Sequence, residues 1–215
     1  MVKFKNRAEL TEIMDDLTQP EEEFLAAYRE LKVINERLGG IRAIERFLPK
    51  GSDLLMLDVA AGGCDVSDAL LDRMSCRIVA LDLNAGGLKL ARRALPVAGD
   101  ALQLPFPEES FDVVMASLFF HHLSEEDDAR VLAEMWRVSR RRVLVNDLHR
   151  HAIAYYSFQA LAALFSKSRM VQHDGPVSVR RAFHPDELLK IAGRAGVPAR
   201  VYRSFPYRLV LVADK

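Results

Sequence analysis

From residue 54 onward, short apolar runs alternate with segments of helical spacing, and this alternation constrains the fold more than any other feature. The runs have strand length and lie at residues 54–57, 77–81, 97–98, 111–116 and 142–145. Strands that alternate with helices form a parallel sheet, with the crossover helices covering both of its faces. The sequence therefore predicts an α/β fold with a doubly wound sheet.

The two ends of the chain depart from this alternation. Residues 1–50 carry helical signals only, which predicts an N-terminal helical cap or lid, followed by a sheet domain over residues 51–215. Two runs at residues 200–202 and 207–212 are too close to enclose a crossover helix, so they predict a C-terminal antiparallel hairpin at the edge of the sheet. An apolar stretch at about residues 150–182 is expected to form an insertion over the active site.

Composition excludes several classes of protein. Thirty basic residues balance thirty acidic ones among 215 residues, so the chain lacks the positive excess that a nucleic-acid binder needs. Two cysteines, Cys64 and Cys76, supply neither a disulfide framework nor a cysteine metal knuckle. No secretory signal or transmembrane segment is evident, which predicts a cytoplasmic protein. The apolar stretch at residues 152–165 is compatible with contact at a membrane surface. The sequence does not predict the oligomeric state.

The turn after the first strand indicates a small-molecule ligand. In a doubly wound sheet, ligands bind beyond the carboxyl ends of the strands. The turn lacks the glycine spacing of dinucleotide or P-loop sites, and Asp58 at the strand end suits a cationic ligand. Asp82 ends the second strand, where a carboxylate can accept hydrogen bonds from ribose hydroxyls.

Four motifs in order carry a resemblance to a known family. They read Leu-Asp-Val-Ala-x-Gly-x-x-Asp, Ala-Leu-Asp-Leu, Gly-Asp-Ala and Pro-Phe-x-x-x-Ser-Phe-Asp-Val-Val. This order resembles the class I S-adenosylmethionine-dependent methyltransferases, and is most similar to the branch that methylates quinols, phenols and related metabolites. The resemblance implies a Rossmann-like seven-stranded sheet, S-adenosylmethionine as cofactor and S-adenosylhomocysteine as product.

The resemblance also implies roles for individual residues. By this resemblance, the methionine half of the cofactor is bound by Asp58, Ala60 and Gly62, and its ribose by Asp82. The adenine is bound by Leu83, Asp100 and Ala101, and Ser117 lies near the sulfonium. The chain departs from the family pattern at two positions, because Ala60 and Cys64 replace the first and third glycines of the turn.

Methyl transfer requires an aligned acceptor and, for an acidic acceptor, removal of a proton. His149 is the first candidate for the base, because it follows the fifth strand on the side where active sites of this fold open. Asp147 is expected to orient it, and both residues could instead cap the following helix. His122 is a second catalytic candidate that could equally order its loop. No metal site is expected.

Aromatic side chains predict the nature of the acceptor. Tyr155 in the apolar segment, Tyr28 in the N-terminal region and His173 are the candidate substrate-binding residues. They suit a small hydrophobic aromatic molecule methylated on a phenol or quinol oxygen. The alternatives are carbon methylation of a quinol-type acceptor, and a non-catalytic partner protein that binds S-adenosylmethionine.

Overall fold

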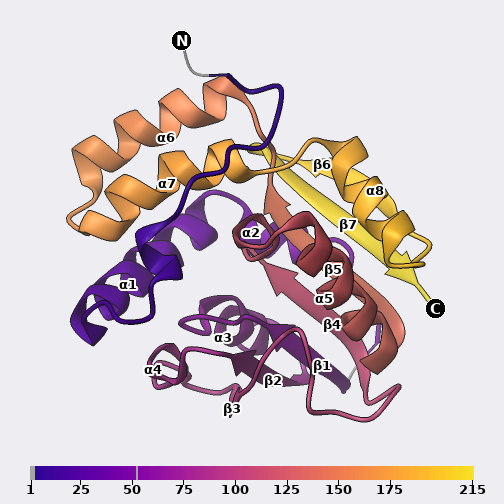
Figure 1. The fold of residues 1–215 in the computed structure, drawn as a ribbon. Helices are drawn as coiled ribbons and strands as arrows, with labels where there is room; N and C mark the ends of the chain where they lie inside the picture. The colour runs from indigo at the N-terminus through magenta and orange to yellow at the C-terminus, as the bar shows by residue number, and fades with distance from the viewer. Residues whose placement is uncertain (1–2, 52) are drawn as a thin grey trace.

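The computed structural model describes residues 3–51 and 53–215, and a seven-stranded sheet forms its centre (Figure 1). The strand order is β3-β2-β1-β4-β5-β7-β6. Strands β1 to β5 pair in parallel, and β5, β7 and β6 pair antiparallel, which confirms the predicted hairpin at the edge. The strands are β1 (Leu54–Val59), β2 (Cys76–Asp82), β3 (Leu95–Ala98), β4 (Phe111–Ser117), β5 (Ser139–Leu148), β6 (Arg200–Ser204) and β7 (Arg208–Asp214).

Helices cover both faces of this sheet. On one face, apolar side chains of β4 and β5 pack against α5 (Glu125–Val138) and α8 (Pro185–Arg194). On the other face, alternate strand residues such as Met56 and Met115 pack against α2 (Gly40–Glu45) and α3 (Asp65–Leu71). Because α2 contributes Ile41 and Ile44 to this second core, that part of the predicted N-terminal cap belongs to the sheet's own core.

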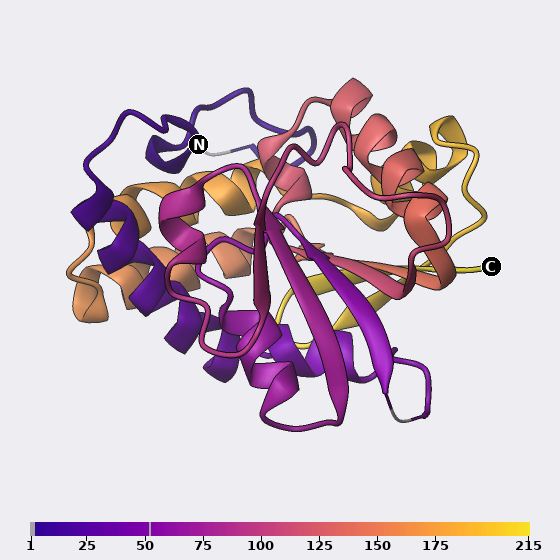
Figure 2. The same cartoon turned by 90° about the horizontal axis from the view of Figure 1, so that it is seen from below.

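Three helices form a layer beyond the carboxyl ends of the strands. They are α1 (Glu21–Arg37), α6 (Ala152–Phe165) and α7 (Arg169–Arg181), and they lie together on one side of the sheet (Figure 2). Buried Phe24 and Ala27 of α1 pack against buried Met170 and Val171 of α7. We call this layer the roof, because it covers the edge where the sequence predicts a site.

Helix α7 differs from expectation, since the sequence around His173 indicates a turn. Instead Asp174, Gly175 and Pro176 lie inside the helix, which begins at the Ser168 cap. Gly175 permits this packing because the ring of Phe158 from α6 occupies the space that a Cβ would fill. A close contact with a neighbouring helix thus outweighs the local turn preference of Asp-Gly-Pro.

Helix α4 (Ala85–Leu88) is short and ends six residues before Ala94. The chain leaves the helix because the buried carboxylate of Asp68 accepts hydrogen bonds from the backbone amides of Arg92, Arg93 and Ala94.

Two short 3₁₀ helices, η1 (Ile13–Asp15) and η2 (Phe120–His122), complete the fold. Among the residues that the structure describes, no helix is both long and apolar enough to span a bilayer.

Candidate active site

A pocket of about 530 Å³ lies where the carboxyl ends of β1, β2 and β4 meet. Its floor is the turn from Ala60 to Gly63, and its far wall includes Leu83, Asp100 and Ala101. We call it the cofactor pocket. Of the residues predicted to bind cofactor, it is lined by Ala60, Gly62, Asp82, Leu83, Asp100, Ala101 and Ser117.

The charge of this pocket selects its ligand. Four carboxylates belong to its lining, those of Asp15, Asp65, Asp82 and Asp100, whereas no lysine or arginine lines it within the described chain. S-adenosylmethionine carries a sulfonium and an ammonium group, which such a pocket attracts, while a dinucleotide's pyrophosphate would be repelled. The residues present therefore fit S-adenosylmethionine.

The turn keeps the backbone of a glycine-rich loop although two glycines are replaced. Ala60 and Cys64 both adopt left-handed backbone, with φ of 56° and 58°, and Gly62 has φ of 52°. The left-handed region is costly for residues with a Cβ, and strain of this kind is common at functional sites. Ala60 and Cys64 thus retain the conformation that glycine would adopt.

The two acids that end β1 and β2 have different places. Asp82 lines the cofactor pocket, and its carboxylate accepts 2.7 Å hydrogen bonds from the amides of Gly62 and Asn84, which fixes the turn against β2. Asp58 lies beneath the turn, is only 2% exposed, and accepts a hydrogen bond of 2.6 Å from the Ser67 hydroxyl. Burial raises the pKa of Asp58 to about 7. Asp58 thus supports the turn, while Asp82 lines the cofactor pocket.

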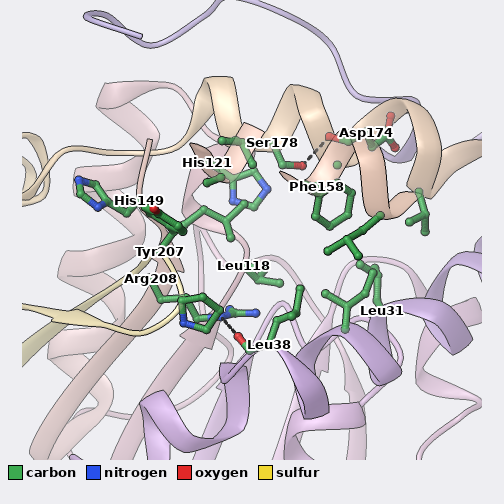
Figure 3. A pocket seen from close by; sticks show the side chains of 18 of the residues that line it. Leu31, Leu38, Leu118, His121, His149, Phe158, Asp174, Ser178, Tyr207 and Arg208 are labelled. Atoms are coloured by element: carbon green, nitrogen blue, oxygen red, sulfur yellow. Dashed lines mark hydrogen bonds between the residues drawn. The ribbon is translucent and has the colours of Figure 1, made fainter. Parts of the chain in front are cut away.

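A second cavity, of about 290 Å³, lies under the roof and is mostly apolar (Figure 3). Leu31 and Ile34 of α1, Phe158 of α6 and Met170 of α7 supply part of its wall. We call it the acceptor cavity. It shares Met14, Leu31, Leu118 and His122 with the cofactor pocket, so the two spaces adjoin.

Arg208 is a buried cation in the wall of the acceptor cavity. Its Nε donates to the carbonyl of Leu38 and its Nη2 donates to the Asn35 side chain, each at 3.0 Å. Its buried Nη1 has no hydrogen-bond partner in the part of the chain that the structure describes. Burial lowers the pKa of Arg208 to about 10, which leaves the guanidinium charged at neutral pH. An unused donor on a buried cation can bind an acidic oxygen.

His149 also lines the acceptor cavity, but it does not line the cofactor pocket. Burial, together with the nearby Arg203, His184, His151 and Arg150, lowers the pKa of His149 to about 4, so the ring is neutral at pH 7.

Asp147 does not orient His149. Instead, the buried Asp147 carboxylate is 2.7 Å from Nδ1 of His121, a residue of η2. Asp147 lies on the same side of the sheet as Val143 and Val145, which faces η2, whereas His149 lies beyond the end of β5, where its backbone bridges to Phe183.

A cluster of polar side chains lies where the two spaces adjoin. Nε2 of His121 and Nε2 of His122 are each 3.8 Å from a different oxygen of Glu12. Nδ1 of His122 is 2.6 Å from Asp15. Burial raises the pKa of Glu12 to about 7. We call Glu12, His121 and His122 the junction cluster.

Glu12 and Asp15 are site residues that no sequence motif predicts. Glu12 and Asp15 lie more than a hundred positions from the histidines, in a segment without a motif, and only the fold brings them together. The signal that could have found them is the pair of acidic residues flanking Ile13 and Met14, two apolar residues that pack against the roof.

The three residues predicted to bind substrate lie elsewhere. Tyr28 lines the cofactor pocket and packs against Gly62 and Gly63. Tyr155 packs against Phe4 and does not line the acceptor cavity. His173 is half exposed on α7, with its Nδ1 2.7 Å from Asp174. From the same helices, Phe158 and Leu31 face the cavity in their place.

Comparison with known proteins supports the assignment of the cofactor pocket. A family model described as a methyltransferase domain matches residues 57–145, which include most of this pocket. A demethylmenaquinone methyltransferase of Paenarthrobacter aurescens is 30% identical over 181 residues, covering 75% of this chain and 69% of that protein. A demethylmenaquinone methyltransferase of Renibacterium salmoninarum is 42% identical over 89 residues, covering 40% of this chain and 36% of that protein.

Several of these matches are partial, since the chain spans 36% to 56% of the length of the first curated relatives. Among solved structures, a SAM-dependent methyltransferase from Aquifex aeolicus has a TM-score of 0.67 at 15% identity, over 91% of this chain and 98% of that one. It shares the fold. Sequence, sheet topology and pocket charge agree: the chain belongs to the class I S-adenosylmethionine-dependent methyltransferases.

Proposed function

We propose that the protein transfers a methyl group from S-adenosylmethionine to a ring carbon of a hydrophobic, quinol-type aromatic acceptor. The observation that carries this proposal is the adjacency of a negatively charged cofactor pocket and an apolar cavity, which share four wall residues. Bound S-adenosylmethionine supplies an electrophilic methyl group. The chain's own task is to place the acceptor in line with that group and to exclude water.

The cofactor is held by residues at the strand ends. Asp82 accepts hydrogen bonds from the ribose hydroxyls, and Leu83 packs on the adenine. Asp100 accepts a hydrogen bond from the adenine amino group, beside Ala101. Ser117 lies near the sulfonium at the end of β4, and its hydroxyl is held by a 2.8 Å hydrogen bond from Asn146.

Arg208 supports carbon methylation over oxygen methylation. Arg208 lines the acceptor cavity but not the cofactor pocket, so an oxygen bound to its Nη1 lies away from the boundary between them. The positive charge favours the ionised form of a phenolic hydroxyl, which makes the ring carbons nucleophilic. The relatives named above and a ubiquinone/menaquinone C-methyltransferase of Xanthomonas campestris, 28% identical over 221 residues, support the same reaction.

His149 is the proposed proton acceptor. It lies in the same cavity, and its neutral ring can accept the proton of the acceptor hydroxyl. After the ring carbon takes the methyl group and S-adenosylhomocysteine is released, the proton displaced from that carbon restores the hydroxyl. Asp147 does not contact the acceptor in this proposal; its role is to position the His121 ring.

The test is transfer from isotopically labelled S-adenosylmethionine to a panel of phenols and reduced naphthoquinones, with carbon and oxygen products distinguished by NMR. We expect carbon-methylated product from a reduced quinone. Oxygen-methylated product alone would favour the alternative reaction. Tight cofactor binding without transfer to any acceptor would leave the protein a binding partner and refute the proposed activity.

A further inference from the structure

The junction cluster brings together three side chains whose oxygen or nitrogen atoms can bind a metal ion. The ligand atoms of Glu12, His121 and His122 all lie within 4.8 Å of one another. Ligands that share one metal ion at 2.0–2.2 Å are separated by roughly 3–3.5 Å. The distances of 3.8 Å from Nε2 of His121 to Oε1 of Glu12 and from Nε2 of His122 to Oε2 of Glu12 exceed this separation by a few tenths of an ångström.

Hydrogen bonding fixes which histidine nitrogens are available. Asp147 pairs with Nδ1 of His121, and Asp15 pairs with Nδ1 of His122, so each Nδ1 carries a proton. The other ring nitrogen of each histidine, Nε2, lies toward Glu12, where it can bind a cation. A carboxylate behind each imidazole is the arrangement that orients histidine ligands in metal sites.

Glu12 adds an independent observation. Its side chain is 2% exposed, and its Oε1 has no hydrogen-bond partner among the described residues. Its other oxygen, Oε2, accepts a 2.6 Å hydrogen bond from the Ser178 hydroxyl. A buried carboxylate oxygen without a donor carries a large energetic cost unless a cation or a proton satisfies it.

The local charge also favours a cation. Three carboxylates, those of Glu12, Asp15 and Asp147, lie next to the two imidazoles. The guanidinium of Arg181 pairs with Asp15 at 2.7 Å and lies 3.7 Å from Glu12. One divalent cation would offset the remaining negative charge.

We propose that Glu12, His121 and His122 form a binding site for a divalent transition-metal ion at the boundary between the cofactor pocket and the acceptor cavity. Two imidazole nitrogens and one carboxylate suit Zn²⁺ or Fe²⁺, and such sites leave coordination positions open. Glu12 and His122 line the acceptor cavity, so the open positions face that cavity. His122 is then a metal ligand, and His149 remains the proposed base.

The inference builds on the proposed function, but its test does not depend on activity. Protein stripped with a chelator is titrated with Zn²⁺ in a calorimeter, and with Co²⁺ while its visible absorption is followed. We expect one ion per chain, and Co²⁺ bands typical of nitrogen and oxygen ligands. Glu12→Gln and His122→Asn should each weaken binding at least tenfold, and Asp147→Asn should weaken it about tenfold to a hundredfold through His121.

His173→Asn is the matched control, because His173 is a half-exposed histidine paired with an aspartate outside the cluster. This variant should bind the ion as the unmodified protein does. Circular dichroism and thermal unfolding report whether each variant is folded, and His122→Asn retains a readout if Glu12→Gln fails to fold. Absence of stoichiometric binding, or equal binding by the cluster variants and the control, would overturn the proposal while leaving the methyltransferase assignment intact.

Discussion

At the scale of single residues, the site depends on carboxylates whose surroundings differ. Asp82 faces the cofactor pocket and has both oxygens engaged by backbone amides, whereas Asp58 is enclosed beneath the turn. Two acids at the ends of neighbouring strands therefore have different surroundings: Asp82 lines the pocket, and Asp58 supports the turn from below.

Replacing Asp82 with alanine should remove most of the affinity for the cofactor. The substitution removes the acceptor of the ribose hydroxyls and frees the amides of Gly62 and Asn84, at a cost of about 3 kcal/mol, or more than a hundredfold in Kd. Isothermal titration with S-adenosylhomocysteine measures the change. The exposed Glu108→Ala is the control, and similar affinities for the two variants would contradict the assigned role.

His149 yields a prediction that depends on pH. We expect His149→Ala to bind cofactor normally and to slow transfer by about a hundredfold, as for loss of a general base. Because the folded pKa is about 4, the base stays neutral as the pH falls below the ordinary histidine value of 6.5. Transfer per unit time should therefore stay nearly constant from pH 7.5 to about 5.5. A decline centred near pH 6.5 would contradict this assignment.

The same pKa shift affects stability. Between pH 6.5 and about 4 the unfolded chain protonates His149 while the folded chain does not, so this group makes the protein less stable as the pH falls through that range. In His149→Ala, the free energy of unfolding should therefore fall less between pH 7 and pH 5 than it does in the unmodified protein. Urea denaturation at the two pH values measures this difference.

At the scale of elements, the roof depends on the contact between α6 and α7. Gly175→Ala would drive a Cβ into the ring of Phe158 and separate the two helices, lowering the free energy of unfolding by about 1–3 kcal/mol. Because Phe158 lines the acceptor cavity, KM for the acceptor should rise while cofactor affinity is unchanged.

Gly193→Ala is the matched control, because Gly193 lies in α8 with open space around the position of a Cβ. That change should raise stability by up to about 1 kcal/mol, the difference in helix propensity. Thermal unfolding of both variants, with kinetics of the same samples, makes the comparison. Equal stabilities of the two variants would show that the Phe158 ring moves aside at little energetic cost, and would contradict the prediction.

The elements show what sequence can predict. The strands were predicted because buried parallel strands read as continuous apolar runs, and their ends placed Asp82, Asp100 and Ser117 around one pocket. Helix α7 was missed because Asp-Gly-Pro normally forms a turn, and its helical state depends on Phe158 of another helix. The junction cluster was missed for a similar reason, since no local pattern links Glu12 to His122.

At the scale of the whole molecule, Arg7 joins the N-terminal segment to the sheet domain. Its guanidinium pairs with the fully buried Asp128 at 2.9 Å and donates hydrogen bonds to the carbonyls of Leu123 and Arg181. These contacts hold in place the segment that carries Met14 and the acid of the junction cluster. The site is thus assembled only when the N-terminal segment packs against the sheet domain.

Arg7→Ala should lower the free energy of unfolding by about 3 kcal/mol or more, because it leaves the Asp128 carboxylate buried without its partner. Adding Asp128→Asn should recover part of that loss, since a neutral side chain costs less to bury. The control is Lys190→Ala, which removes an exposed ion pair and should change stability by less than about 0.5 kcal/mol. Equal effects of Arg7→Ala and Lys190→Ala in urea denaturation would contradict this account.

The two spaces of the active site draw on different stretches of the chain. The family match at residues 57–145 contains most of the wall around the cofactor, while the acceptor cavity is built mainly from residues 12–38 and 148–208. Substitutions in these outer stretches can therefore alter which molecule is methylated without disturbing the methyl donor. Evolution, or an engineer, can diversify the acceptor repertoire of such a scaffold while its donor chemistry is inherited unchanged.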